Sequence, residues 1–60
     1  MNIWIKSAKI KNDFPIDSIA IVEDTFVQVI GYLLQEGMIQ VMNAMGKEFD
    51  VYPEEAILDG

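Results

Sequence analysis

The segment from Thr25 onward most constrains the fold, because it alternates uncharged runs of β-branched and aromatic residues with glycine-containing turns. The first run, Thr25–Gln35, ends at Glu36-Gly37, and a second run, Met38–Met42, precedes a strand-like stretch at Lys47–Tyr52. Glycine in such a turn adopts positive φ without steric cost, which lets neighbouring strands fold back on each other. The pattern therefore predicts a series of antiparallel strands.

Three details refine this prediction. Gly31 lies inside a strand-like run, where glycine often marks a bend or a bulge. Ile39 and Val41 are two positions apart and should share one face of their strand. Pro53 presets φ for a helical first turn, and the chain should end in a short strand at Ile57-Leu58.

The N-terminal third is expected to supply two more strands. Residues 2–10 place Ile3 and Ile5 on one face of a first strand, and residues 11–17 form a loop that contains Pro15. Residues 19–22 are rich in β-branched residues and predict a second strand. The acidic pair Glu23-Asp24 suits the turn that follows it.

A helical interpretation competes with the strands. Asp17-Ser18 could cap a helix that ends at Gly37, and residues 38–45 could form a second helix. Apolar residues at helical spacing would then lie on one face: Ile19, Val22, Phe26, Ile30 and Leu33. We favour strands, because β-branched residues are restricted at χ1 in helices and Gly31 would cost about 1 kcal/mol in mid-helix.

The order of strands and turns, and above all the segment Phe49–Leu58 with its proline and acidic pair, resembles the SH3-like small barrel. The resemblance implies an all-β fold with five strands and a short 3-10 turn before the last strand. Residues 1–60 would form a single barrel domain. The Ala-Leu-Tyr-Asp-Tyr motif of proline-peptide binders is absent, and the only tryptophan is Trp4. Recognition of proline-rich peptides is therefore not expected.

The composition excludes several kinds of chemistry. The chain contains neither cysteine nor histidine, so thiolate or imidazole zinc ligands and a histidine-activated nucleophile are absent. The glycines are scattered and form no phosphate-binding loop. The adjacent acids Glu23-Asp24 and Glu54-Glu55 lack the spacing of a calcium loop. We expect no enzyme activity, no metal and no cofactor.

Charge and hydropathy bear on partners and location. The formal net charge is −6, and Lys6, Lys9 and Lys11 precede all ten acidic residues. An acidic body repels nucleic acid and steers towards basic protein surfaces. No apolar run is long enough to span a membrane, and the first residues lack the order of a signal peptide, so a cytoplasmic location is expected.

Hydrophobic residues make up 52% of the chain, which is high for a chain this short and predicts apolar side chains at a contact surface. Methionine, tyrosine and tryptophan suit such surfaces. Met38 and Met42 should face away from the core if Ile39 and Val41 face it. The candidate protein-binding residues are Trp4, Tyr32, Met38, Met42 and Tyr52.

The resulting expectation is a small acidic accessory module, of bacterial or phage type, that docks on a partner protein with a basic surface. Two alternatives stay open, a nucleic-acid-mimicking inhibitor of a DNA or RNA enzyme and a self-assembling structural protein that forms homo-oligomers. Direct nucleic-acid binding through Lys6, Lys9 and Lys11 is the weakest of the hypotheses, because a patch of three lysines without arginine is thin.

Overall fold

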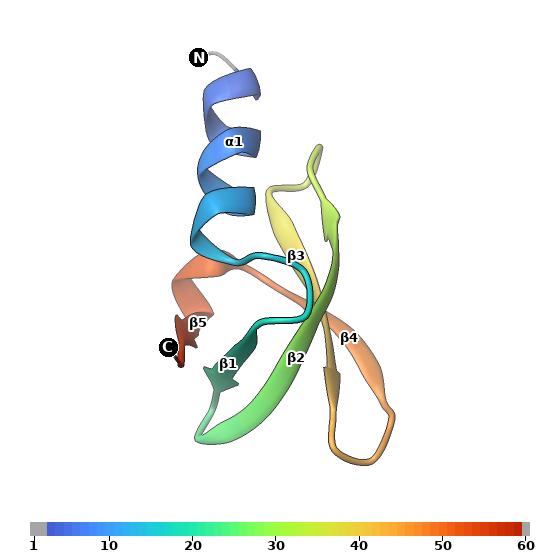
Figure 1. The fold of residues 1–60 in the computed structure, drawn as a ribbon. Helices are drawn as coiled ribbons and strands as arrows, with labels where there is room; N and C mark the ends of the chain where they lie inside the picture. The colour runs from blue at the N-terminus through green and yellow to red at the C-terminus, as the bar shows by residue number, and fades with distance from the viewer. Residues whose placement is uncertain (1–2, 60) are drawn as a thin grey trace.

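The computed structural model describes residues 3–59 of the chain, and the side chains of residues 8–59. One helix is followed by five strands, with a 3-10 turn before the last strand (Figure 1). The elements are α1 (Ile3–Asp13), β1 (Ile19–Val22), β2 (Thr25–Leu33), β3 (Met38–Asn43), β4 (Glu48–Val51), η1 (Pro53–Glu55) and β5 (Ala56–Leu58). The helical interpretation of residues 19–45 is therefore wrong.

The strands form one antiparallel sheet in the order β4-β3-β2-β1-β5. β2 lies at its centre, which agrees with the uncharged sequence of that strand. β1 pairs with β2, β2 with β3 and β3 with β4, and β5 returns to pair with β1. Within residues 3–59 no pairing joins β4 to β5, so closure of the sheet into a barrel is not detected.

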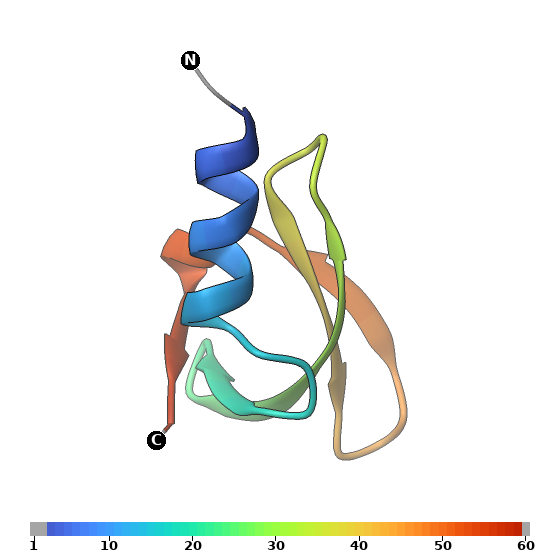
Figure 2. The ribbon, with the colours of Figure 1, turned by 45° about the horizontal axis from the view of Figure 1, so that its top comes forward.

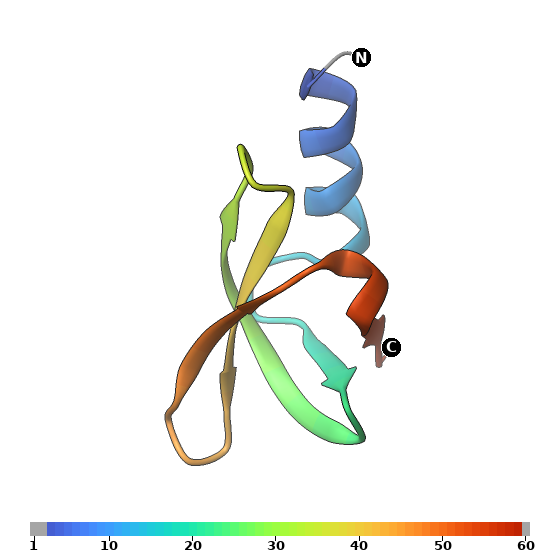
Figure 3. The ribbon, with the colours of Figure 1, turned by 180° about the vertical axis from the view of Figure 1, so that it is seen from behind.

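The sheet is strongly twisted, and its inner face carries the core (Figure 3). Ile39, Val29 and Val41 are the largest fully buried side chains, and Ile39 and Val41 share the inner face as expected. Tyr32 and Phe49 pack against this core at partial exposure. The buried apolar residues are Ile10, Phe14, Ala20, Val22, Val27, Val29, Ile39, Val41, Val51 and Ala56.

The expected first strand at residues 2–10 is wrong, because residues 3–10 are helical, and the fold is therefore mostly β rather than all-β. The apolar alternation extends only from Ile3 to Ile5. Beyond it, Ile10 and Phe14 are four residues apart, the spacing of one helical face, and both side chains are buried. The N–H of Phe14 donates to the carbonyl of Ile10 at 2.9 Å. Burial of this face favours the helix over a strand.

The C-terminal part of α1 has η1 on one side and the β2–β3 turn on the other (Figure 2). A cavity of about 190 Å³ lies where these elements meet, lined by residues that include Ile10, Asp13, Gly37 and Pro53. The loop after α1 is held against β2, because Asp17 donates its N–H to Val29 at 2.8 Å and accepts from the Gln28 amide at 3.0 Å. This anchoring fixes where β1 begins.

The turns and the bulge agree with the sequence prediction. The register of β2 on β3 shifts between Val29 and Gly31, so Ile30 is the extra residue of a bulge. Gly37 and Gly46 have φ of 69° and 83° in the two turns that flank β3. The bulge also reverses which residues face inward, since Tyr32 now lies opposite buried Ile39.

Candidate docking surface

The outer face of the sheet carries an apolar row across three strands. Ile21 of β1 pairs with Phe26 of β2 on one side and with Ile57 of β5 on the other. Phe26 is 60% exposed and Ile57 is 68% exposed, although both are large apolar side chains. Ile19, which lies two residues before Ile21 on the same face, is 41% exposed. The row therefore leaves apolar area in contact with solvent.

Met42 of β3 extends this surface. Gln28 of β2 pairs with Ile19 on one side and with Met42 on the other, so the three residues share the outer face. We call Ile19, Ile21, Phe26, Met42 and Ile57 the outer apolar face. A hollow of about 330 Å³ opens beside it and is lined by residues that include Ile19, Phe26, Met42 and Ala44. A hollow of this size among exposed apolar side chains can receive an apolar side chain of another molecule.

The cause of this exposure is the register of the β1–β2 hairpin. Its two-residue turn, Glu23-Asp24, has positive φ at both positions, as in a type I′ turn. This turn pairs Val22 with Thr25 and Ile21 with Phe26. Since side chains alternate along a strand, burial of Ala20 and Val22 on the inner face sends Phe26 to the outer face. The exposed phenylalanine is thus fixed by the turn.

Met38 and Met42, predicted to point away from the core, do lie on the outer face, on either side of Gln40. Both are half-buried, and Met38 pairs with Leu33. Gln40 lies opposite Gly31, and its side chain covers the place that a Cβ at Gly31 would occupy. Only Met42 of the sequence-predicted binding residues therefore joins the outer apolar face.

The aromatic candidates lie elsewhere. Tyr32 is on the inner face, half-buried, and its hydroxyl donates to the carbonyl of Phe14 at 2.6 Å. Tyr52 is 47% exposed at the end of β4, where its N–H donates to the Glu55 carboxylate at 3.2 Å. Trp4 lies in α1, and its side chain is outside the described residues. The structure does not bring Tyr32, Tyr52 and the methionines together.

Sequence reasoning missed Phe26, Ile19 and Ile57, because an uncharged run such as that of β2 does not by itself show that one of its faces is exposed, and neither do the apolar residues of β1 and β5. The faces differ, however: Val27 and Val29 are buried, whereas Phe26 is not. The available signal was the alternation of valines with Phe26 and Gln28 in the sequence Thr25–Val29. That alternation distinguishes an inner from an outer face once the hairpin register is known.

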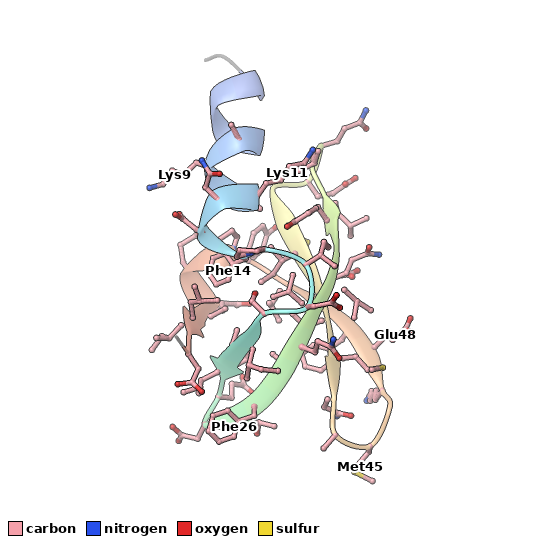
Figure 4. The ribbon with its side chains drawn as sticks, viewed as in Figure 1. Lys9, Lys11, Phe14, Phe26, Met45 and Glu48 are labelled. Carbon is pink, nitrogen blue, oxygen red and sulfur yellow. The ribbon has the colours of Figure 1, made fainter. Side chains whose placement is uncertain are left out.

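Charges surround the apolar row. Glu23 and Asp24 lie at the hairpin tip next to Phe26, and Glu48 pairs with Met42 on the other side. Lys9 and Lys11 project from α1, at the opposite end of the molecule from Phe26 and Met45 (Figure 4). Among residues 8–59, the one ion pair joins exposed Lys9 and Asp13 at 3.7 Å. The rim of the outer apolar face is thus acidic.

The described part of the chain was also searched for a metal site and for a membrane-spanning helix. Among its residues, no group of three or more acidic, histidine or cysteine side chains could hold a metal ion. Over the same range, no helix is both long and apolar enough to cross a membrane. Family models, curated proteins and solved structures were each compared with the chain, and none of them matches it.

Proposed function

We propose that this chain is a small SH3-like barrel that works as a protein-docking module, without catalytic chemistry or cofactor. Support for the barrel comes from the strand order and from η1 immediately before β5, both of which agree with the SH3-like arrangement. A shared fold leaves the function open, so the proposal for docking rests on the surface itself.

The observation that carries the docking proposal is the row of Phe26, Ile21 and Ile57, in which Phe26 and Ile57 are exposed and Ile21 is half-buried. Removing apolar area from water contributes roughly 25 cal/mol per Å², and large aromatic side chains dominate such contacts. Side chains that stay in solvent contribute none of this free energy to the isolated domain. Binding of a partner with a complementary apolar centre would bury them, and this burial would stabilise the complex.

The acidic rim indicates the kind of partner. Glu23, Asp24 and Glu48 border the outer apolar face, and the chain carries a net charge of −6. A partner with basic residues around an apolar centre would be steered towards this face. A second copy of the chain would approach more slowly, because both copies are acidic and repel each other. The proposed partner is therefore a protein with a basic surface.

The test is capture of partners from bacterial lysate by the tagged wild-type chain and by the variants Phe26→Asp and Ile57→Asp. Each variant places a charge where the partner's apolar centre would lie. The matched control is Ile16→Asp, which changes an exposed isoleucine on the loop before β1, away from the outer apolar face. A protein that is retained by the control and lost by both variants supports the proposal.

Equal capture by all variants would refute docking through this face. Adding DNA at low and high salt separates the alternative of a nucleic-acid mimic, since its partner would be displaced by DNA and by salt. Sedimentation of the purified chain reports self-assembly. Concentration-dependent dimers that disappear in Phe26→Asp would assign the same face to a second copy of the chain and would overturn the choice of partner.

A further inference from the structure

The outer edge of β4 carries backbone groups that no other strand uses. The N–H of Asn43 donates to the carbonyl of Lys47 at 3.0 Å, which fixes the phase of the β3–β4 ladder. Hydrogen-bonded pairs recur at every second residue of an antiparallel ladder, so Phe49 and Val51 bond to β3. The N–H and C=O groups of Glu48 and Asp50 therefore point away from the sheet.

This edge is open along the length of β4. β4 pairs only with β3 within the described residues, and the backbone bonds of the turns and loops leave Glu48 and Asp50 untouched. Both side chains are exposed and lie on the outer face, opposite Met42 and Gln40. An unpaired edge of this kind is a ready template for another strand.

The charges decide which strand fits. Two copies joined antiparallel at β4 would place Glu48 and Asp50 of one copy beside the same carboxylates of the other, and like charges directly opposite are destabilising. The β5 edge is a poor alternative partner, because the N–H of Ala56 already donates to Pro53. A strand with basic residues opposite Glu48 and Asp50 has no such conflict.

We propose that the free edge of β4 is a strand-addition site for an extended segment of another protein in which basic residues alternate with apolar ones. The segment adds antiparallel to β4, with its basic side chains beside Glu48 and Asp50 on the outer face. Its apolar side chains lie on the inner face, next to half-buried Phe49 and buried Val51. The backbone bonds supply affinity, and the alternation supplies specificity. This site shares Glu48 with the rim of the outer apolar face, but the proposal does not rest on the role proposed for that face.

The probe is a synthetic peptide of alternating lysine and valine, blocked at both ends. The comparison peptide has the same composition with all lysines before all valines. We expect the alternating peptide to bind about tenfold more tightly, and to slow amide hydrogen exchange at Glu48 and Asp50 in NMR spectra. Equal binding of the two peptides would reduce the interaction to general attraction by an acidic surface and would overturn the proposal.

Backbone methylation of the probe tests the hydrogen bonds without altering the protein. In the antiparallel arrangement the lysine N–H groups face β4, whereas the valine N–H groups face solvent. N-methylation of the lysines should abolish binding, and N-methylation of the valines should leave it intact. The reverse pattern, or no effect from either, would contradict strand addition at this edge.

Matched variants of Asp50 provide the same test from the protein side. Asp50→Asn removes the charge and keeps the N–H, whereas Asp50→Pro removes both, and an edge strand tolerates proline where the N–H points outward. Binding should fall about threefold in the first variant and at least about tenfold further in the second. Equal affinities would overturn the proposal. Phe26→Asp should bind the peptide like the wild type, which separates this site from the docking face.

Discussion

The hydroxyl of Tyr32 donates a 2.6 Å hydrogen bond to the backbone carbonyl of Phe14, joining the centre of the sheet to the end of α1. The bulge at Ile30 makes this contact possible, because it turns Tyr32 to the inner face opposite Ile39. Without the extra residue, strict alternation after Val27 and Val29 would place Tyr32 on the outer face. The bulge therefore determines how the helix is attached.

Tyr32→Phe should lower the free energy of unfolding by about 1 kcal/mol, because the Phe14 carbonyl loses its donor while the ring is retained. The measurement is urea denaturation followed by circular dichroism. Tyr52→Phe is the matched control, since its hydroxyl makes no hydrogen bond to residues 8–59. An equal loss in both variants would show that the hydrogen bond contributes no stability of its own.

Replacing the β1–β2 turn by Asn-Gly, as Glu23→Asn with Asp24→Gly, should stabilise the protein by about 1 kcal/mol. Both residues have positive φ, 50° and 63°, a conformation that asparagine and glycine adopt at lower cost. Thermal unfolding measures the gain. The variant Glu23→Gln with Asp24→Ala removes the same charges without relieving the backbone. If it stabilises equally, repulsion between carboxylates is the cause and the backbone argument fails.

The glycines should respond differently to alanine. Gly46→Ala is expected to cost about 1 kcal/mol, because φ at Gly46 is 83° and a Cβ is disfavoured there. Gly31→Ala should cost less, since the new Cβ meets only the end of the flexible Gln40 side chain. Comparing the two variants by urea denaturation ranks these costs.

The Gly31 argument has its own check in a double-mutant cycle with Gln40→Ala. The cost of Gly31→Ala should shrink once Gln40 is truncated, because the displaced atoms are gone. A cost that is unchanged in the Gln40→Ala background would place the strain in the backbone of the bulge. It would then rule out a side-chain contact as the source.

Neighbouring residues of β3 should differ sharply in their contribution to stability. Ile39→Ala is expected to lower the free energy of unfolding by about 2–5 kcal/mol, because Ile39 is fully buried. A loss of this size is comparable to the whole stability of so small a domain. Met38→Ala should cost about 1 kcal/mol or less, since Met38 is half-buried on the outer face. Loss of dispersed amide signals in NMR spectra identifies unfolding. Similar behaviour of the two variants would contradict the assignment of the faces.

The sequence predicts the strands well where turns and alternation agree. Gly37 and Gly46 mark turns by their positive φ, and Pro53 marks η1, because these residues restrict the backbone locally. α1 was missed because only Ile10, which lies between Lys9 and Lys11, is buried among its described side chains, and Phe14 directly after the helix is the next buried position. Two buried positions leave little trace in the sequence of a helix.

The outer apolar face was missed for a different reason. In β1 both faces are apolar, since Ile19 and Ile21 alternate with Ala20 and Val22. Hydrophobicity alone cannot choose the inner face of such a strand, and the smaller residues are the ones that are buried. The choice follows from β2, because the hairpin register places Ala20 opposite buried Val27 and Ile21 opposite exposed Phe26. The sequence of β1 alone does not contain that information.

The pairing of β5 with β1 also has a consequence for the order in which the fold forms and opens. Every other strand pair joins neighbours through a short turn, whereas Val22 and Ala56 meet across most of the chain. Closing that long loop costs about 3 kcal/mol of chain entropy, and only a three-residue strand compensates for it. The β1–β4 hairpins should therefore assemble first, and β5 should be the last strand to dock and the first to detach.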